Sequence, residues 1–209
     1  MEQEKFQQLV QDFLSRLELP AEQTAKPLII ATIGLIGSGR STVTKMVAAK
    51  LKGAVLIKSD SARYLLKEAG LPWGDNVKQI LKGVAVELLG KGYGVVFDGN
   101  AADEEDRKNI SEIAEQTEAS VYYVRINIDP AIAKERKRVR YDDPSWVSSF
   151  EDFRVNTTEK ILKNLDERVE LHKNLKSSDI PNLLGEVDNN DSLEELEKQV
   201  EKLIEKIQF

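Results

Sequence analysis

Residues 34–42 (GLIGSGRST) carry the clearest chemical signal in this sequence. Glycines let the backbone adopt conformations that other residues avoid, so successive N–H groups can point toward a single anion. The segment follows a short apolar run and precedes a helix-forming run, and the N-terminus of a helix attracts anions. This pattern predicts a phosphate-binding loop, with an ordinary glycine-rich turn as the alternative. The residues expected to hold the phosphates are Gly34, Gly37, Ser38, Gly39, Arg40, Ser41 and Thr42.

Position 40 departs from the usual phosphate-loop pattern, which has lysine where this chain has Arg40. Lysine is a compact point charge, whereas the arginine guanidinium is a broad planar fork. Arg40 keeps the positive charge and can bind two phosphate oxygens, but it needs more room. The sequence therefore supports nucleotide binding more strongly than phosphoryl transfer.

Two residues are expected to bind magnesium. The Ser41 hydroxyl, at the start of the predicted helix, can reach an ion shared with the phosphates. The apolar run 95–98 (VVFD) ends in Asp98, as the second magnesium-site element of such proteins does, with a helix cap as the alternative. Gly99 and Asn100 follow in place of a glutamate, which disfavours a hydrolytic motor ATPase. An Asn-Lys-x-Asp segment is missing from the sequence, which disfavours a guanine-specific GTPase.

The order of these motifs resembles that of the small P-loop kinases, especially the group of polynucleotide kinase, zeta-toxin-like and adenylylsulfate-kinase-like proteins. The resemblance covers about residues 28–205. It rests on the glycine-rich loop, on segments 59–63 (SDSAR) and 95–100 (VVFDGN), on Arg107, and on the final segment 187–189. It implies transfer of a phosphoryl group from ATP, with Mg²⁺, to a hydroxyl of a small-molecule or nucleotide-like acceptor. Acceptors differ widely within the group, so none is implied.

The resemblance also assigns residues to the acceptor. Asp60 lies where the group has the carboxylate that orients the acceptor hydroxyl or accepts its proton, and a helix N-cap is the alternative. Arg63 is expected to bind an acidic part of the acceptor. Asn100 and Arg107 complete the expected substrate-binding set, with a turn residue and a surface residue as their alternatives.

A basic run, residues 134–140 (KERKRVR), follows the predicted fourth strand. Arg136 and Arg140 are four residues apart and therefore share a face on a helix. Such arginines can close over ATP and neutralise charge as the phosphoryl group moves. We expect a lid around residues 130–147 and a catalytic set of Arg40, Asp60, Arg136 and Arg140. A solvated basic face and a nucleic-acid-binding patch are the alternatives.

Short apolar runs alternate with helical patterns along the chain. They predict a three-layer α/β/α domain of the P-loop kinase type, with a mainly parallel sheet of about five strands. Residues 1–26 are expected to form an N-terminal helical extension, and residues 27–209 the kinase-like domain. His172 continues an apolar helical stripe, so we expect it to be structural. The predicted strands cover residues 28–33, 54–57, 95–97, 121–128 and 183–187.

Composition limits the classes of function. The chain has 209 residues, of which 41% are hydrophobic and 32% charged, enough for a folded core. Its net charge of -6 argues against binding of long nucleic acid. Because cysteine is absent, disulfides and iron–sulfur clusters are excluded. No apolar run approaches the roughly 20 residues of a membrane span, and the first residues do not resemble a secretory signal. A cytoplasmic monomer or homodimer without membrane contact is expected.

Two other functions are open at this stage. A nucleotide-binding regulatory protein would follow if Arg40 had abolished or weakened transfer. A polynucleotide 5′-hydroxyl kinase is allowed by the resemblance but disfavoured by the net charge. The sequence does not decide the acceptor, the preference for ATP or GTP, or which lid arginine acts.

Overall fold

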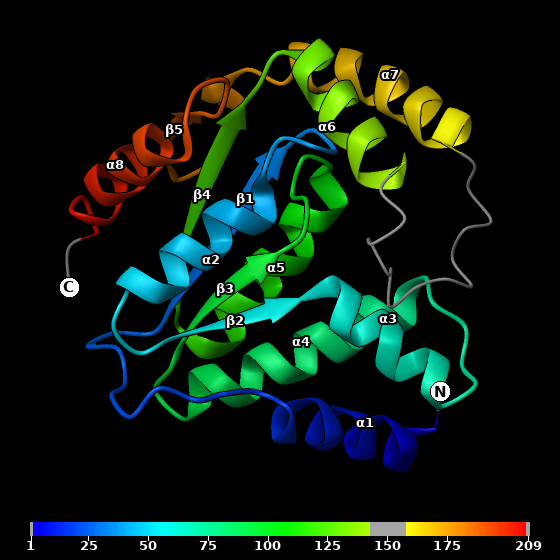
Figure 1. Cartoon of the computed structure of the whole chain (residues 1–209). Coiled ribbons are helices and arrows are strands. Elements are labelled where there is room, and N and C mark those ends of the chain that lie inside the picture. The colour runs from blue at the N-terminus through cyan, green and yellow to red at the C-terminus, as the bar shows by residue number, and fades with distance from the viewer. Residues whose placement is uncertain (1, 143–157, 208–209) are drawn as a thin grey trace.

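Five parallel strands form the central layer of the protein (Figure 1). The computed structural model describes residues 2–142 and 158–207. The strand order is β2-β3-β1-β4-β5, and every neighbouring pair is parallel. The strands therefore end side by side at one edge, where parallel α/β sheets bind their ligands. The strands are β1 (Leu28–Gly34), β2 (Ala54–Lys58), β3 (Gly94–Asp98), β4 (Ser120–Asn127) and β5 (Leu183–Asp188).

Helices cover both faces of this sheet, which confirms the predicted three-layer architecture. One face is covered by α2 (Arg40–Lys50) and α8 (Leu193–Ile204). Two further helices, α6 (Pro130–Asp142) and α7 (Thr158–Asn174), lie side by side beyond the end of β4 (Figure 1). A short 3-10 helix, η2 (Ser177–Asp179), precedes β5. The other face is covered by α1 (Gln3–Ser15), α3 (Ser59–Glu68), α4 (Asp75–Gly90) and α5 (Glu104–Thr117).

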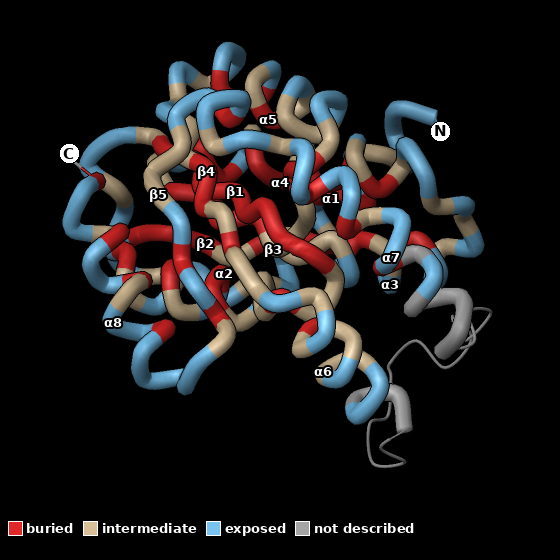
Figure 2. The backbone as a smooth tube through the Cα atoms, turned by 90° about the horizontal axis from the view of Figure 1, so that it is seen from above, coloured by how far each residue is buried: buried red, intermediate tan, exposed pale blue. Residues whose placement is uncertain are grey.

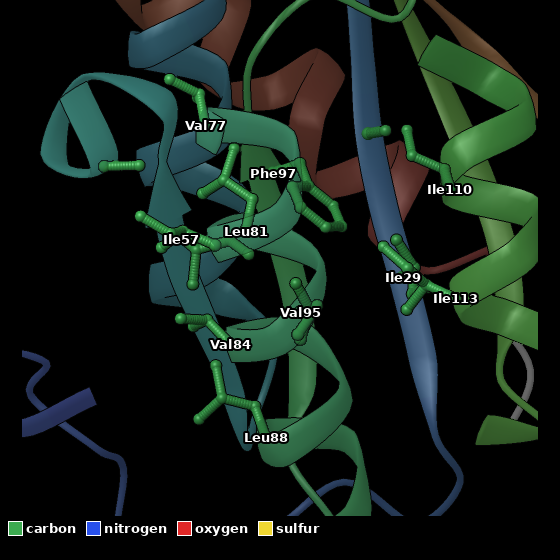
Figure 3. Close-up of a cluster of buried hydrophobic side chains, with 14 of the residues drawn as sticks. Ile29, Ile57, Val77, Leu81, Val84, Leu88, Val95, Phe97, Ile110 and Ile113 are labelled. Carbon is green, nitrogen blue, oxygen red and sulfur yellow. The ribbon is translucent and has the colours of Figure 1, made fainter. Parts of the chain in front are cut away.

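The strands are buried because helices cover them on both sides. Every residue of β1 is buried, and Figure 2 shows the strands at the centre of the molecule. On the face that α4 covers, Leu81, Val84 and Leu88 lie against Ile57 of β2 and Val95 of β3 (Figure 3). Their spacing of three and four residues gives α4 one continuous apolar face. The packing of this core fixes the positions of the strand ends, which carry the candidate site.

The N-terminal helix α1 belongs to the same core cluster. Leu9, Val10 and Phe13 are buried in it, and α1 packs on α4 and α3. The close approach needs Gly83 of α4, because a Cβ there would lie 2.7 Å from Val10 Cγ2. The predicted extension over residues 1–26 thus supplies part of the cover of the sheet.

Two other expectations concern the predicted lid and membrane contact. Residues 143–147 of the predicted lid, and the side chain of Arg140 in α6, lie outside the described residues. Over the part of the chain that is described, none of the helices combines the length and apolar character needed to cross a membrane.

Candidate active site

The predicted phosphate loop joins the end of β1 to the start of α2, at the carboxyl edge of the sheet. Gly37 and Gly39 have φ angles of +88° and +90°, which side-chain-bearing residues rarely adopt. A Cβ would lie 2.5 Å from the Ala133 carbonyl oxygen at the first position and 2.2 Å from Asn189 Nδ2 at the second. Both positions therefore require glycine for conformation and for space.

The start of α2 offers backbone donors to an anion. Gly39 is its N-cap and has no side chain to bond the first turn. Within the described part of the chain, the N–H groups of Arg40 and Ser41 make no hydrogen bond, while those of Thr42 and Val43 bond to the Gly39 carbonyl. Free N–H groups at a helix N-terminus are the arrangement that binds phosphate.

A residue from the loop after β5 holds the phosphate loop in place. Asn189 is buried and donates from Nδ2 to the carbonyl oxygen of Ser38, at 2.7 Å. The Ser38 side chain is fully buried, and its Oγ has no hydrogen-bond partner among the described residues. Gly34 leaves room for it, since a Cβ there would lie 2.5 Å from that Oγ. The sequence pointed to the segment 187–189 without giving Asn189 this role.

The structure brings together the two predicted magnesium ligands. Ser41 Oγ donates to Asp98 Oδ1 at 3.1 Å. Burial raises the pKa of Asp98, while the Ser41 hydrogen bond and the nearby Arg40 charge oppose the rise. In the described residues no cluster of three acidic, His or Cys side chains could hold a metal alone. This donor set fits Mg²⁺, which binds through one or two protein oxygens together with phosphates and waters.

The Arg40 side chain folds back onto the phosphate loop. Its Nη1 donates to the carbonyl oxygen of Gly34 at 2.8 Å. Burial lowers the pKa of Arg40, whereas the charges of Asp98 and Asp60 raise it. The guanidinium stays protonated because arginine does not lose its proton in proteins. A fixed positive charge thus lies beside both acidic residues of the site.

Asp60 and Arg63 lie at the start of α3, directly after β2. The helix begins at Ser59, so Asp60 lies within its first turn. The N-cap is Lys58, and no side chain caps this helix. The alternative of Asp60 as a cap therefore has no support in the geometry. Asp60 Oδ1 accepts a hydrogen bond from Arg63 Nη1 at 2.5 Å.

Asn100 and Arg107 contact the protein itself. Asn100 Oδ1 accepts a hydrogen bond from the Gly34 N–H at 3.2 Å. Arg107 Nη1 donates to the carbonyl oxygens of Ala101 and Ala102, at 2.9 and 2.6 Å. The Asn100 bond joins the loop after β3 to the end of β1, and the Arg107 bonds join the same loop to α5. Contact of either side chain with substrate stays a prediction.

Helix α6, from the predicted lid region, and helix α7 both pack against the phosphate loop. Leu35 of the loop is buried with Ala133 of α6 and with Leu165 and Val169 of α7. Arg136 of α6 is partly exposed. The loop therefore shares a small apolar core with α6 and α7.

Sequence reasoning missed Arg168 of α7, whose charge acts on Arg40, and Arg125 of β4, whose charge acts on His172. Arg168 pairs with Asp103 at 2.7 Å, and Arg125 donates to the His172 carbonyl oxygen at 3.0 Å. His172 is buried as expected, and its Nε2 has no hydrogen-bond partner in the described structure. Burial, together with the charges of Arg40, Arg125 and Arg168, lowers the pKa of His172 to about 4. No local sequence pattern marks these long-range neighbours.

Comparisons with known structures identify the fold. An APS kinase of Mycobacterium tuberculosis, in complex with AMPPNP and APS, has a TM-score of 0.54 and 16% identity; the match covers 88% of this chain and 98% of that one. A gluconokinase from Sinorhizobium meliloti 1021 has a TM-score of 0.54 and 17% identity, over 86% and 92%. Kti12 of Chaetomium thermophilum, in complex with ADP-AlF3, has a TM-score of 0.61 and 15% identity, over 87% and 100%. The fold is that of the small P-loop kinases, as predicted.

The family follows from the sequence. A family model described as an AAA domain matches residues 29–170, which is more than half of the chain. The protein belongs to this AAA domain family. No curated protein shows significant sequence similarity to the chain.

Proposed function

We propose that the protein is a magnesium-dependent phosphotransferase that moves the γ-phosphate of ATP to a hydroxyl of a small-molecule or nucleotide-like acceptor. One observation carries the proposal: Arg40 lies near both the Asp98 carboxylate, which pairs with Ser41, and the Asp60 carboxylate. Binding of a nucleotide requires the loop and the magnesium ligands. A carboxylate on the acceptor side is useful only for transfer.

The role of each residue follows from its charge and position. The free N–H groups at the start of α2, with Arg40, would bind the phosphates. Ser41 and Asp98 would hold Mg²⁺, which neutralises phosphate charge when bound. Arg136 and Arg140 would add positive charge from α6.

Asp60 has the central role on the acceptor side. It would accept the proton of the acceptor hydroxyl while the hydroxyl oxygen bonds to the γ-phosphorus. The bond from that phosphorus to the oxygen of the leaving ADP breaks in the same step. Arg63, paired with Asp60, would bind an acidic part of the acceptor.

Related structures support a nucleotide as the donor. The APS kinase was solved with AMPPNP and APS, and Kti12 with ADP-AlF3. The gluconokinase is, after the APS kinase, a second kinase with this fold. Because identities are between 15% and 17%, these proteins support the nucleotide and leave the acceptor undecided.

A regulatory nucleotide-binding protein is the second candidate, and one contact favours it. The bond from Arg40 Nη1 to the Gly34 carbonyl directs the guanidinium onto the loop backbone. If this contact persists when a nucleotide is bound, the fixed guanidinium leaves the γ-phosphate out of line with the acceptor hydroxyl. Transfer is then slow.

Asp60→Asn separates transfer from binding. Loss of the proton acceptor should reduce phosphorylation of the acceptor by roughly a hundredfold or more. Affinity for Mg-ATP should stay within about threefold, because the phosphate loop is intact. The measurement is ADP release and transfer of labelled γ-phosphate across a panel of hydroxyl compounds.

Asp75→Asn is the matched control, since Asp75 also lies in the first turn of a helix, α4, on the same face of the sheet. It should leave turnover unchanged. Equal turnover of wild type and Asp60→Asn would contradict the acceptor role. An equal loss of turnover in both variants would show that the loss comes from removing a charge at a helix N-terminus and not from the acceptor role of Asp60.

A further inference from the structure

A pocket of about 420 Å³ lies beside Asp60, between the end of α1 and the start of α3. Figure 1 shows α1 running along α4, and α1 also packs on α3. The volume lies within the range of about 300 to 1,000 Å³ typical of small-molecule sites. The lining residues used below are Phe13, Arg16, Leu17, Lys58, Asp60 and Tyr64.

Asp60 connects this pocket to the phosphate loop. Its side chain lines the pocket, and its charge acts on both Arg40 and Asp98. Lys58, the last residue of β2, is in register with Asp98 of β3. Asp60 is therefore shared by the pocket and the charged groups of the phosphate-loop site.

The charges of the lining favour an anionic ligand. Arg16 and Lys58 are cationic, and no described carboxylate lies within ion-pair distance of the Lys58 ammonium. The guanidinium of Arg16 bonds to Glu68 through Nη1 at 2.7 Å, which leaves its other donors available. Asp60 is the one acidic residue of the lining, and it pairs with Arg63. The charged side chains of the lining are thus two cations and one carboxylate.

The remaining lining is apolar or aromatic, apart from Ser61. Phe13 and Leu17 come from α1, and Tyr64 of α3 is 40% exposed. An exposed tyrosine beside a pocket offers a flat apolar face and a polar tip to a ligand. The pocket therefore matches a molecule that combines an anionic group with a carbon skeleton or ring.

We propose that this pocket is the acceptor site, and that it takes a hydroxyl compound bearing a carboxylate or a phosphate ester. Arg16 and Lys58 bind the anionic group, Tyr64 contacts the skeleton, and Asp60 orients the hydroxyl. The N-terminal helix α1 is then part of the binding site as well as cover for the sheet. This inference rests on the proposed function, in which the hydroxyl oxygen displaces ADP from the γ-phosphorus and Asp60 receives its proton.

Calorimetric titration of the full chain, saturated with Mg-ADP, tests the pocket directly. The probes are glycerate and glycerol 3-phosphate, with glycerol as their neutral partner, and AMP, with adenosine as its neutral partner. We expect at least one anionic probe to bind at millimolar concentration or below and its neutral partner to bind at least about tenfold more weakly. Glycerate tests for recognition of a carboxylate, and glycerol 3-phosphate and AMP test for recognition of a phosphate ester.

Arg16→Gln and Glu68→Gln form the matched pair of variants. Both remove the same exposed ion pair, but only the first removes a cation from the pocket. Arg16→Gln should weaken the bound probe about tenfold or more, and Glu68→Gln should leave its affinity within about twofold. Equal effects of the two variants, or no binding of any anionic probe up to about 10 mM, would overturn the proposal.

The same protein samples separate this outcome from failure of the proposed function. If Mg-ADP stabilises the protein and the probes do not bind, the pocket assignment is wrong and the nucleotide site stands. If Mg-ADP does not bind either, the proposed function itself fails.

Discussion

Arg40 is the residue on which catalytic competence depends. It stands where other phosphate loops have lysine, and it is held by the Gly34 carbonyl at 2.8 Å. The fork of a guanidinium can release one donor and still bind two phosphate oxygens. We therefore expect Arg40 to bridge phosphate oxygens once a nucleotide is present.

Arg40→Ala and Arg40→Lys test this expectation. Alanine should reduce turnover by a large factor, because no other described side chain supplies a cation over the loop backbone in this way. Lysine should bring no gain, since the loop is shaped around arginine. Turnover and nucleotide affinity are measured for both variants. A gain of tenfold or more with lysine, about 1.4 kcal/mol of transition-state stabilisation, would show that the native residue limits transfer.

His172 gives the protein a defined pH dependence. Its pKa is about 4 in the folded chain, against an ordinary value of 6.5. Between these values the unfolded chain binds a proton that the folded chain does not, so stability rises with pH in this window. The contribution is present above pH 6.5 and is lost as the pH falls toward 4.

His172→Leu should remove this contribution. His172 is the single histidine of the chain, so His172→Leu has no imidazole that titrates. Its carboxylates are the same as those of wild type, so their effect on the pH dependence is common to both proteins. The free energy of unfolding in urea, measured at pH 7 and pH 5.5, should fall more in wild type than in the variant. An equal fall in both proteins would show that His172 titrates normally.

Some site residues could be predicted because their signal is local. Ser41 and Asp98 each follow a recognisable run, and parallel strand ends bring them together at 3.1 Å. Asn189 bonds to the loop, and Arg168 and His172 interact electrostatically with Arg40, all from segments more than a hundred residues away along the chain. Their contacts depend on tertiary packing, which leaves no mark in a window of sequence.

At the scale of elements, the phosphate loop is held from two sides. Asn189 bonds to it from the loop after β5, and Leu165 of α7 packs on Leu35. The helical pattern predicted α7 as an element. It did not predict that this helix packs on the loop, because an apolar stripe does not specify its partner.

Leu165→Ala should disturb the loop through this contact. Leu165 is fully buried, so its truncation should destabilise the protein by about 2 to 5 kcal/mol. The affinity for Mg-ADP should fall as well, because Leu35 loses a packing partner. Urea unfolding and calorimetry measure the two effects.

Leu171→Ala on the same helix is the control. Leu171 is 38% exposed, so its loss should change stability by about 0.5 kcal/mol or less and leave Mg-ADP affinity unchanged. Unchanged stability and affinity in Leu165→Ala would contradict the proposed coupling between α7 and the loop.

At the scale of the whole molecule, the alternation of apolar runs and helical patterns was sufficient to predict five parallel strands between two helical layers. Strand ends were less well predicted: β1 and β2 extend one residue further, to Gly34 and Lys58. Residues 1–26 were expected to form an N-terminal helical extension, with its helix as cover for the sheet. The structure packs α1 into its core through Phe13, a contact between distant segments that no local pattern reveals.

Nucleotide binding by the phosphate loop is the central claim, and thermal unfolding with and without Mg-ATP tests it most directly. A ligand selective for the folded state at a hundred times its Kd adds about 2.7 kcal/mol, or about 5 to 10 °C in Tm for a chain of this size. Gly39→Asp, which adds a carboxylate at the loop, should abolish the shift. Gly70→Asp, at another positive-φ glycine with open space around it, should keep it. The predicted result is that Mg-ATP raises the Tm of wild type and of Gly70→Asp but not that of Gly39→Asp. No rise in the Tm of wild type at millimolar Mg-ATP would contradict the account.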